Sequence, residues 1–230
     1  MRGLISILFM PGSILRVRIL LIAFVSQFFL LGCTRHETLV ISGNLEDPNQ
    51  GIPVGGATVE LWTQRIEAGI FRANYDLAGT RITDTGGRFS FEMDYRNYTG
   101  LKLNFAKAGY YGWTLELNTE EVKSEGGIDA RYQILPKAVL QIHVLNAQPV
   151  NEQDYFEFRL LNGFTSCEVC CKSEMYQFSG MNIDQEVLCQ IIGHQDILIR
   201  WSKRKNDEQV FRTDTFFIKA FDTTRIELIY

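Results

Sequence analysis

The chain has 230 residues, of which 46% are hydrophobic and 22% are charged, and its formal net charge is −4. This apolar fraction is typical of a folded globular protein and excludes a wholly disordered chain. The acidic balance argues against nucleic acid and anionic lipid headgroups as partners, because both are bound by clusters of lysine and arginine. We therefore expect no nucleic-acid partner.

The N-terminal region has the pattern of a signal peptide. The apolar run 19–31 follows Arg16 and Arg18, and it is shorter than the about 20 residues that a membrane-spanning helix needs. It ends in Leu30-Leu31-Gly32-Cys33, which resembles the lipobox of bacterial lipoproteins. The resemblance implies cleavage before Cys33 and the attachment of fatty acyl chains to this residue, and two or more chains give stable anchoring. The alternative is an ordinary signal peptide or signal anchor with an incidental cysteine.

Removal of residues 1–32 takes away three of the 23 basic residues and none of the 27 acidic ones, so the mature chain carries a net charge of −7. Thr34, and not aspartate, follows the cysteine. By analogy with enteric sorting rules, this residue indicates the outer membrane. We therefore expect a protein of the bacterial cell envelope that is held at a membrane by its lipid anchor. Met10 is an alternative start to Met1.

Apolar residues in the rest of the chain recur at every second position. In one such segment, Phe89, Phe91 and Met93 alternate with polar residues. Alternation of this kind places one face of a strand on a core and the other face in water. The sequence therefore predicts an all-β protein, in which two tandem β-sandwich-like domains at 37–136 and 137–230 follow the signal peptide. The same alternation is found in the segments 59–62, 101–105, 140–144, 156–160 and 225–230.

Residues 38–111 carry a recognisable series of strands and turns. Its landmarks are Gly51-Ile52-Pro53-Val54, Gly56-Ala57-Thr58-Val59-Glu60-Leu61, Thr83-Asp84-Thr85-Gly86-Gly87-Arg88-Phe89-Ser90-Phe91 and Lys107-Ala108-Gly109-Tyr110. They resemble the carboxypeptidase regulatory-like domain, a prealbumin-like β-sandwich of exported bacterial proteins. The resemblance implies that Phe89 and Phe91 enter a sandwich core. It implies a spacer or accessory role and no peptidase activity. The segment 63–80 departs from the family pattern, and we expect it to form an extended or irregular hairpin.

The sequence shows no catalytic motif. None of the three histidines, His36, His143 and His194, is followed three residues later by glutamate, as the zinc site of the carboxypeptidases would require. Nucleophile-elbow, phosphate-loop and zinc-protease motifs are missing as well. We therefore expect no enzyme activity, no cofactor and no metal, although a hydrolase built from scattered carboxylates stays open. The alternation places His143 on an exposed face, and His194 lies next to Gly193 in a predicted turn.

Four cysteines remain after the acylation site. In an exported chain they predict disulfides, for which three complete pairings are possible. The fourth of them follows an inward alternation, and we expect it to pair with one of the upstream group and to close the loop that contains Tyr176. Zinc is an alternative, but a second closely spaced ligand pair is missing. A redox role would need a helix N-terminus to lower the thiol pKa. The four are Cys167, Cys170, Cys171 and Cys189.

Four aromatic residues are candidates for stacking on sugar rings, because an aromatic ring offers apolar area with a polar tip. The alternative is that these rings cover a strand edge, pack against the second domain or fill the core. The sequence thus favours a non-catalytic accessory lipoprotein that presents its sandwiches to an envelope protein partner. A polysaccharide-binding surface lipoprotein is the alternative. The four aromatic residues are Trp62, Tyr110, Tyr111 and Trp113.

Overall fold

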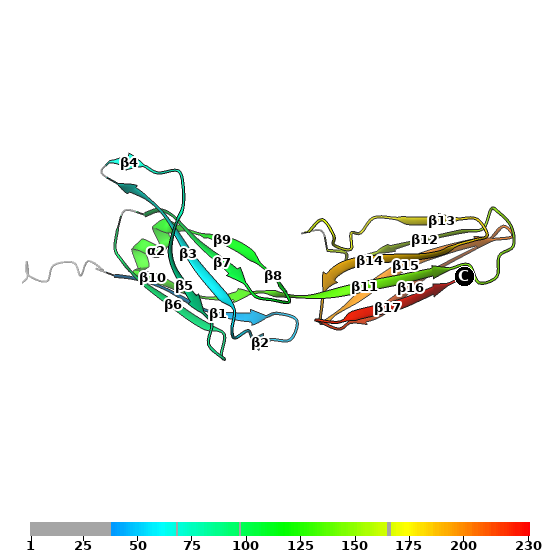
Figure 1. Cartoon of the computed structure of the whole chain (residues 1–230), viewed down its shortest axis with the longest axis horizontal. Coiled ribbons are helices and arrows are strands. Elements are labelled where there is room, and N and C mark those ends of the chain that lie inside the picture. Colours follow the sequence, from blue (N-terminus) through cyan, green and yellow to red (C-terminus); the bar gives the residue numbers. More distant parts are fainter. Residues whose placement is uncertain (1–37, 68, 97, 165–166) are drawn as a thin grey trace, which may run out of the picture. The chain divides into compact units, whose positions relative to one another are not determined.

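The structure is a computed structural model that describes residues 38–67, 69–96, 98–164 and 167–230 (Figure 1). The predicted signal peptide (1–32) and the predicted acylation site Cys33 lie outside the described residues. Within those residues almost every element is a strand, and the one helix, α2 (Thr119–Glu125), has 7 residues. The chain is therefore all-β, as the alternation of apolar residues predicts.

The first β-sandwich is built from two sheets. In one sheet the central strand β1 pairs in parallel with β10 and antiparallel with β6 and the short β2. The other sheet has the order β5-β3-β7-β9, with β4 on the end of β3. The strands are β1 (Thr38–Asp47), β2 (Ile52–Pro53), β3 (Thr58–Glu67), β4 (Ile70–Phe71), β5 (Asp76–Ile82), β6 (Arg88–Asp94), β7 (Tyr98–Ala106), β9 (Trp113–Leu117) and β10 (Gly127–Gln133).

The inward face of β1 shows why this strand lies at the centre of its sheet. Leu39, Ile41 and Leu45 alternate along it and are fully buried. Gly43 lies between them on the same face, and a side chain there would collide with the ring of Tyr132 on β10. Only glycine leaves room for this ring between the sheets, so a substitution of Gly43 would displace the tyrosine.

Two expectations from the sequence are confirmed, and they concern the first core and the segment 63–80. Phe89 and Phe91 are buried in the first core. Gly87, with φ 75°, forms the turn before them, and its left-handed backbone explains why glycine is needed there. The segment 63–80 forms a hairpin in which β3 pairs with β4 and then with β5.

The second β-sandwich also has two sheets, with the strand orders β14-β11-β17 and β13-β12-β15-β16. Its core is centred on Phe156 and Phe158, which are completely buried. The predicted boundary between residues 136 and 137 falls inside β11 and not in a loop, so the exact division stays a prediction. The strands are β11 (Leu135–Leu145), β12 (Tyr155–Leu160), β13 (Tyr176–Ser179), β14 (Asp184–Ile192), β15 (Gln195–Lys205), β16 (Glu208–Ile218) and β17 (Thr223–Ile229), and β8 (Tyr110–Tyr111) pairs with the start of β11.

The two sandwiches repeat one topology. In the first, the seven main strands are β1, β3, β5, β6, β7, β9 and β10, and they form the sheets β6-β1-β10 and β5-β3-β7-β9. If these seven strands are replaced one by one, in chain order, by β11 to β17, the two strand orders become those of the second sandwich, β14-β11-β17 and β13-β12-β15-β16. In both, the first strand pairs in parallel with the last. The second half of the chain, for which its sequence indicated no family, is thus a topological repeat of the first.

Candidate functional site

Two of the unpaired strand edges of the first sandwich belong to β9 and β10. β9 pairs with β7 and β10 pairs with β1, and within the described part of the chain neither has a neighbour on its other side. Helix α2 joins the two strands. Asn118 starts this helix by accepting hydrogen bonds from the backbone N–H groups of Glu120 and Glu121, and Gly126 ends it with a left-handed backbone. This short helix brings the edge of one sheet next to the edge of the other.

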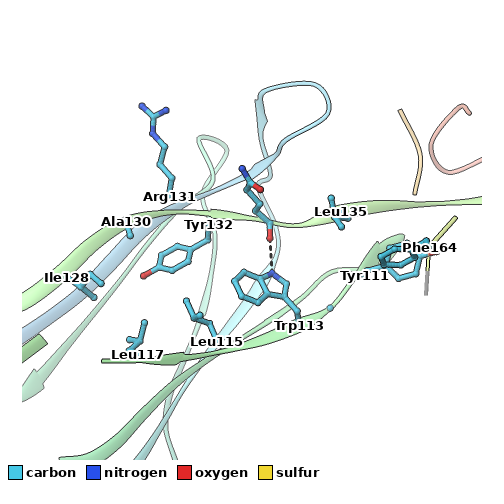
Figure 2. Close-up of a pocket in the computed structure, with 12 residues that line it drawn as sticks. Tyr111, Trp113, Leu115, Leu117, Ile128, Ala130, Arg131, Tyr132, Leu135 and Phe164 are labelled. Carbon is cyan, nitrogen blue, oxygen red and sulfur yellow. Dashed lines mark hydrogen bonds between the residues drawn. The ribbon is translucent and has the colours of Figure 1, made fainter. Parts of the chain in front are cut away.

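An apolar groove of about 600 Å³ lies between β9 and β10 (Figure 2). Its walls are the inward-facing side chains of the two strands, several of which are only partly buried although they pack on the core. Among the described residues that line it, Arg131 is the only charged one. At about 3.4 Å per residue, the five residues of β9 give the groove a length of about 17 Å. The wall residues are Trp113, Leu115 and Leu117 on β9 and Ile128, Ala130 and Tyr132 on β10.

Trp113 links the two walls of the groove. Its indole Nε1–H donates a hydrogen bond of 2.7 Å to the backbone carbonyl oxygen of Gln133 on β10, which is the dashed line in Figure 2. Its ring stacks on Phe105 with the ring centroids 5.2 Å apart. Trp113 therefore belongs to the inner side of the sandwich, where its ring is part of a wall.

Tyr132 places an unsatisfied hydroxyl group beside the groove. The residue is only 4% exposed, and its hydroxyl oxygen has no hydrogen-bond partner. Burial, with a smaller contribution from the charge of Asp129, raises the pKa of Tyr132 to about 12. A buried hydroxyl without a partner costs about 1–3 kcal/mol.

The four aromatic residues predicted from the sequence do not form one surface. Trp62 lies on the outer face of β3, where its Nε1–H donates to the Oε2 atom of Glu60 at 3.1 Å. Tyr110 is buried, with 9% exposure, so its ring is not available to a sugar. Tyr111 is half-buried; burial raises its pKa to about 12, and its hydroxyl donates to the carbonyl oxygen of Ile191. Only Trp62 keeps the solvent-facing position that sugar stacking requires.

The four cysteines form two disulfides in the structure. Cys171 is bonded to Cys189 on β14, with the Cα atoms 5.0 Å apart, and this bond closes the loop that contains Tyr176. Cys167 is bonded to Cys170. With this pairing all four sulfur atoms are used, and none is left as a thiolate ligand for zinc.

His143 differs from the sequence-based expectation of an exposed side chain. It does lie on the outer face of β11, but its ring is held between two carboxylates of the neighbouring strands. The Nε2 atom is 2.7 Å from Asp184, and the Nδ1 atom is 2.6 Å from Glu227. These hydrogen bonds, of which that to Asp184 has the larger effect, raise the pKa of His143 above its usual 6.5. His194 does lie in the turn with Gly193, with φ 53°.

The described residues contain no group of three or more histidine, cysteine, aspartate or glutamate side chains placed to hold a metal ion. No helix of that part of the chain is long and apolar enough to cross a membrane. The groove itself offers apolar walls, two unpaired backbone edges and one buried hydroxyl group. Such an arrangement can bind an extended segment, but it lacks the paired nucleophile and base that covalent catalysis needs.

No family model and no curated protein matches the chain. Among solved structures, the TIE protein of Bacillus anthracis is 14% identical, with a TM-score of 0.35, and the match covers 84% of this chain and 33% of that protein. The 9R-lipoxygenase of Cyanothece PCC8801 is 16% identical (TM-score 0.31; 42% and 16% covered). The shaft pilin SpaA of Lactobacillus rhamnosus GG is 9% identical (TM-score 0.28; 84% and 97% covered). The chain thus spans about a third of the TIE protein and about a sixth of the lipoxygenase. These similarities are too low to support an inference about function. By its fold, the chain belongs to the class of all-β proteins with two tandem sandwiches.

Proposed function

We propose that this protein is a lipid-anchored accessory protein of the bacterial cell envelope, which holds a protein partner and catalyses no reaction. The partner contributes an extended segment that lies in the groove between β9 and β10. The observation that supports this most is that two unpaired strand edges flank one apolar groove. The anchor rests on the sequence Leu30-Leu31-Gly32-Cys33, and the first sandwich is a carboxypeptidase regulatory-like domain by its landmarks.

Strand addition explains the features of the groove together. An added strand forms main-chain hydrogen bonds with an edge strand, and every second side chain points into the space between the sheets. Exposed edges with apolar walls are a hazard for aggregation unless they have a partner. A segment of about five residues with alternating apolar side chains matches the length of β9.

The chemistry of the groove favours binding over catalysis. Among the described residues of β9 and β10 that line it, Tyr132 is the one ionisable inward-facing group, and a pKa of about 12 keeps its hydroxyl protonated at neutral pH. Arg131 alternates to the outer face of β10 and stays charged at any physiological pH. Neither group is a general base, so the proposed role requires recognition alone.

Site-specific photo-crosslinking in living cells tests the groove. A photoreactive residue at Leu115 faces the groove, whereas one at Thr114, its neighbour on the same strand, faces outward. We expect position 115 to crosslink one dominant envelope protein through an extended apolar segment, and position 114 not to crosslink that segment. Equal crosslinking from both positions, or crosslinking to no protein from position 115, would exclude the groove as the binding site.

The anchor is tested separately. Cys33→Ser should leave the signal peptide uncleaved and should remove the lipid-dependent partition of the protein into a detergent phase. An unchanged mature size and an unchanged partition would exclude lipidation at this residue. Because Cys33 lies far in sequence from the groove, this test can fail while the crosslinking experiment succeeds.

A second candidate function is glycan binding on the outer face of β3. Trp62 lies opposite Lys102 on β7, and the Lys102 Nζ atom lies 3.9 Å from the ring centroid of Tyr75. The carboxylate of Glu60 accepts hydrogen bonds from Trp62 and from Asn104. This outer face therefore combines aromatic rings with polar groups, as sugar-binding surfaces do. Retardation in a polysaccharide gel that Trp62→Ala abolishes would support this function, and equal mobility of both proteins with and without glycan would exclude it.

A further inference from the structure

The second sandwich contains a buried cluster of a lysine, an asparagine and an aspartate. Asn146 directly follows β11, Asp154 directly precedes β12, and Lys205 is the last residue of β15. Asn146 is 6% exposed, Asp154 is completely buried, and the side chain of Lys205 is 15% exposed. The cluster lies in the other sandwich from the groove, so the proposed binding function makes no use of it.

The distances place the lysine amine against the asparagine amide. The Lys205 Nζ atom lies 2.7 Å from Asn146 Oδ1 and 3.9 Å from Asp154 Oδ2. The Asn146 Nδ2 atom donates to Asp154 Oδ2 at 3.0 Å and to the carbonyl oxygen of Gly180 at 3.2 Å. Because Nδ2 faces two acceptors and Oδ1 faces a donor, the network fixes the orientation of the amide. With a C=O bond of about 1.23 Å, the carbonyl carbon of Asn146 lies within about 3.9 Å of the amine.

The surroundings favour a reactive amine and an ionised carboxylate. Burial lowers the pKa of Lys205 and outweighs the opposing attraction of Asp154, so the ammonium group loses its proton more easily. Burial by itself raises the pKa of Asp154, but hydrogen bonds from Asn146 and from the backbone N–H groups of Val150 and Asn151 outweigh it, and the net pKa lies below its usual range. A neutral buried lysine amine is a good nucleophile, and a neighbouring carboxylate is the group that such a nucleophile needs as its base.

From this geometry we propose that Lys205 and Asn146 form an intramolecular isopeptide bond, with Asp154 as the proton carrier. Asp154 takes a proton from the Lys205 ammonium group. The neutral amine attacks the carbonyl carbon of Asn146, and a new C–N bond forms. Asp154 returns the proton to the side-chain nitrogen of Asn146, the old C–N bond breaks, and this nitrogen leaves as ammonia, which takes up the second proton of the attacking amine. No electron acceptor or other reactant is needed, because the reaction is an exchange of one amide for another.

The bond would join the end of β11 to the end of β15 across a sequence separation of 59 residues. The first sandwich supplies an internal comparison. Lys107 directly follows β7, which is the topological counterpart of β15, and its Nζ atom donates to the carbonyl oxygen of Gly55 at 2.6 Å. A backbone amide in a connecting loop is the partner there, so Lys107 is the matched control for Lys205.

Peptide mass spectrometry of the purified, reduced mature protein tests the proposal. We expect a branched peptide that joins the segments containing Asn146 and Lys205 and is lighter than the two together by one ammonia, about 17 Da. Asp154→Asn should abolish the branched peptide, and Lys107→Arg should leave it unchanged. Two separate linear peptides with unmodified Asn146 and Lys205 in the wild-type protein would overturn the proposal. This measurement does not depend on the folding of any variant. A branched peptide that persists in D154N would overturn the role of Asp154.

Discussion

Loss of the disulfide between Cys171 and Cys189 should destabilise the second sandwich more than loss of the bond between Cys167 and Cys170. The first bond spans a sequence separation of 18 and the second a separation of 3. By restricting the unfolded chain, a disulfide that closes a loop of this length stabilises the folded protein by roughly 3 kcal/mol for the first bond and roughly 1.6 kcal/mol for the second. In a chain of this size, these free energies correspond to decreases in melting temperature of about 6–12 °C and about 3–6 °C.

The assay compares the double variants C171A/C189A and C167A/C170A with the wild-type protein, each exported so that disulfides can form. Thermal and urea unfolding are followed by tryptophan fluorescence, to which Trp201 of the second sandwich contributes. Cys171 is completely buried, so C171A/C189A also loses packing contacts, and the difference between the variants should exceed the chain-entropy value. An equal or larger loss of stability in C167A/C170A would refute the reasoning from loop length.

Other consequences can be measured on the same protein. Trp113→Ala should reduce the free energy of unfolding by about 3 kcal/mol, because it removes a ring that packs on the core and a hydrogen bond to β10. Trp62→Ala, on the outer face, should change the free energy of unfolding by about 0.5 kcal/mol or less. A larger loss of stability in Trp62→Ala than in Trp113→Ala would contradict the assignment of the two residues to opposite faces. The pKa of His143 is raised by hydrogen bonds to Asp184 and Glu227, so its contribution to stability is fully present below its unfolded pKa of 6.5 and is lost as pH rises through the higher folded pKa. His143→Gln should therefore flatten the fall in stability as the pH rises above about 6.5, measured by urea unfolding. An unchanged slope would show that the ring does not titrate as inferred.

The strands could be predicted because their signal is local. Alternation of apolar residues depends on neighbouring positions alone, so the segments around Phe89 and Leu140 can be recognised as strands without knowledge of the fold. The turn at Gly87 has the same character, because a left-handed backbone selects glycine directly. These two kinds of signal were enough to predict an all-β chain with two sandwiches.

The candidate sites could not be predicted because they depend on pairing between distant strands. Trp113 and Gln133 are 20 residues apart, and nothing near either residue indicates that the indole donates to that carbonyl group. Asn146 and Lys205 are 59 residues apart, and each lies at a strand end in a polar segment that reads as an ordinary loop. The repeated topology was missed for the same reason, since strand order is a property of the pairing and leaves no trace in composition.

Comparison of the two sandwiches shows that the groove is not a necessary product of this topology. The counterparts of β9 and β10 in the second sandwich are β16 and β17, and they too are edge strands. On β16, however, Arg212 and Asp214 lie on the face that carries buried Ile199 on β15. Asp214 accepts a hydrogen bond from the Trp201 indole at 2.6 Å, and the Arg212 guanidinium lies 5.9 Å from the centroid of the same ring. In the second sandwich, two charged groups of β16 that interact with Trp201 therefore lie on this side, whereas in the first the corresponding side chains of β9 are apolar. Because the strand order is the same in both copies, the apolar groove of the first sandwich results from its own side chains and not from the topology.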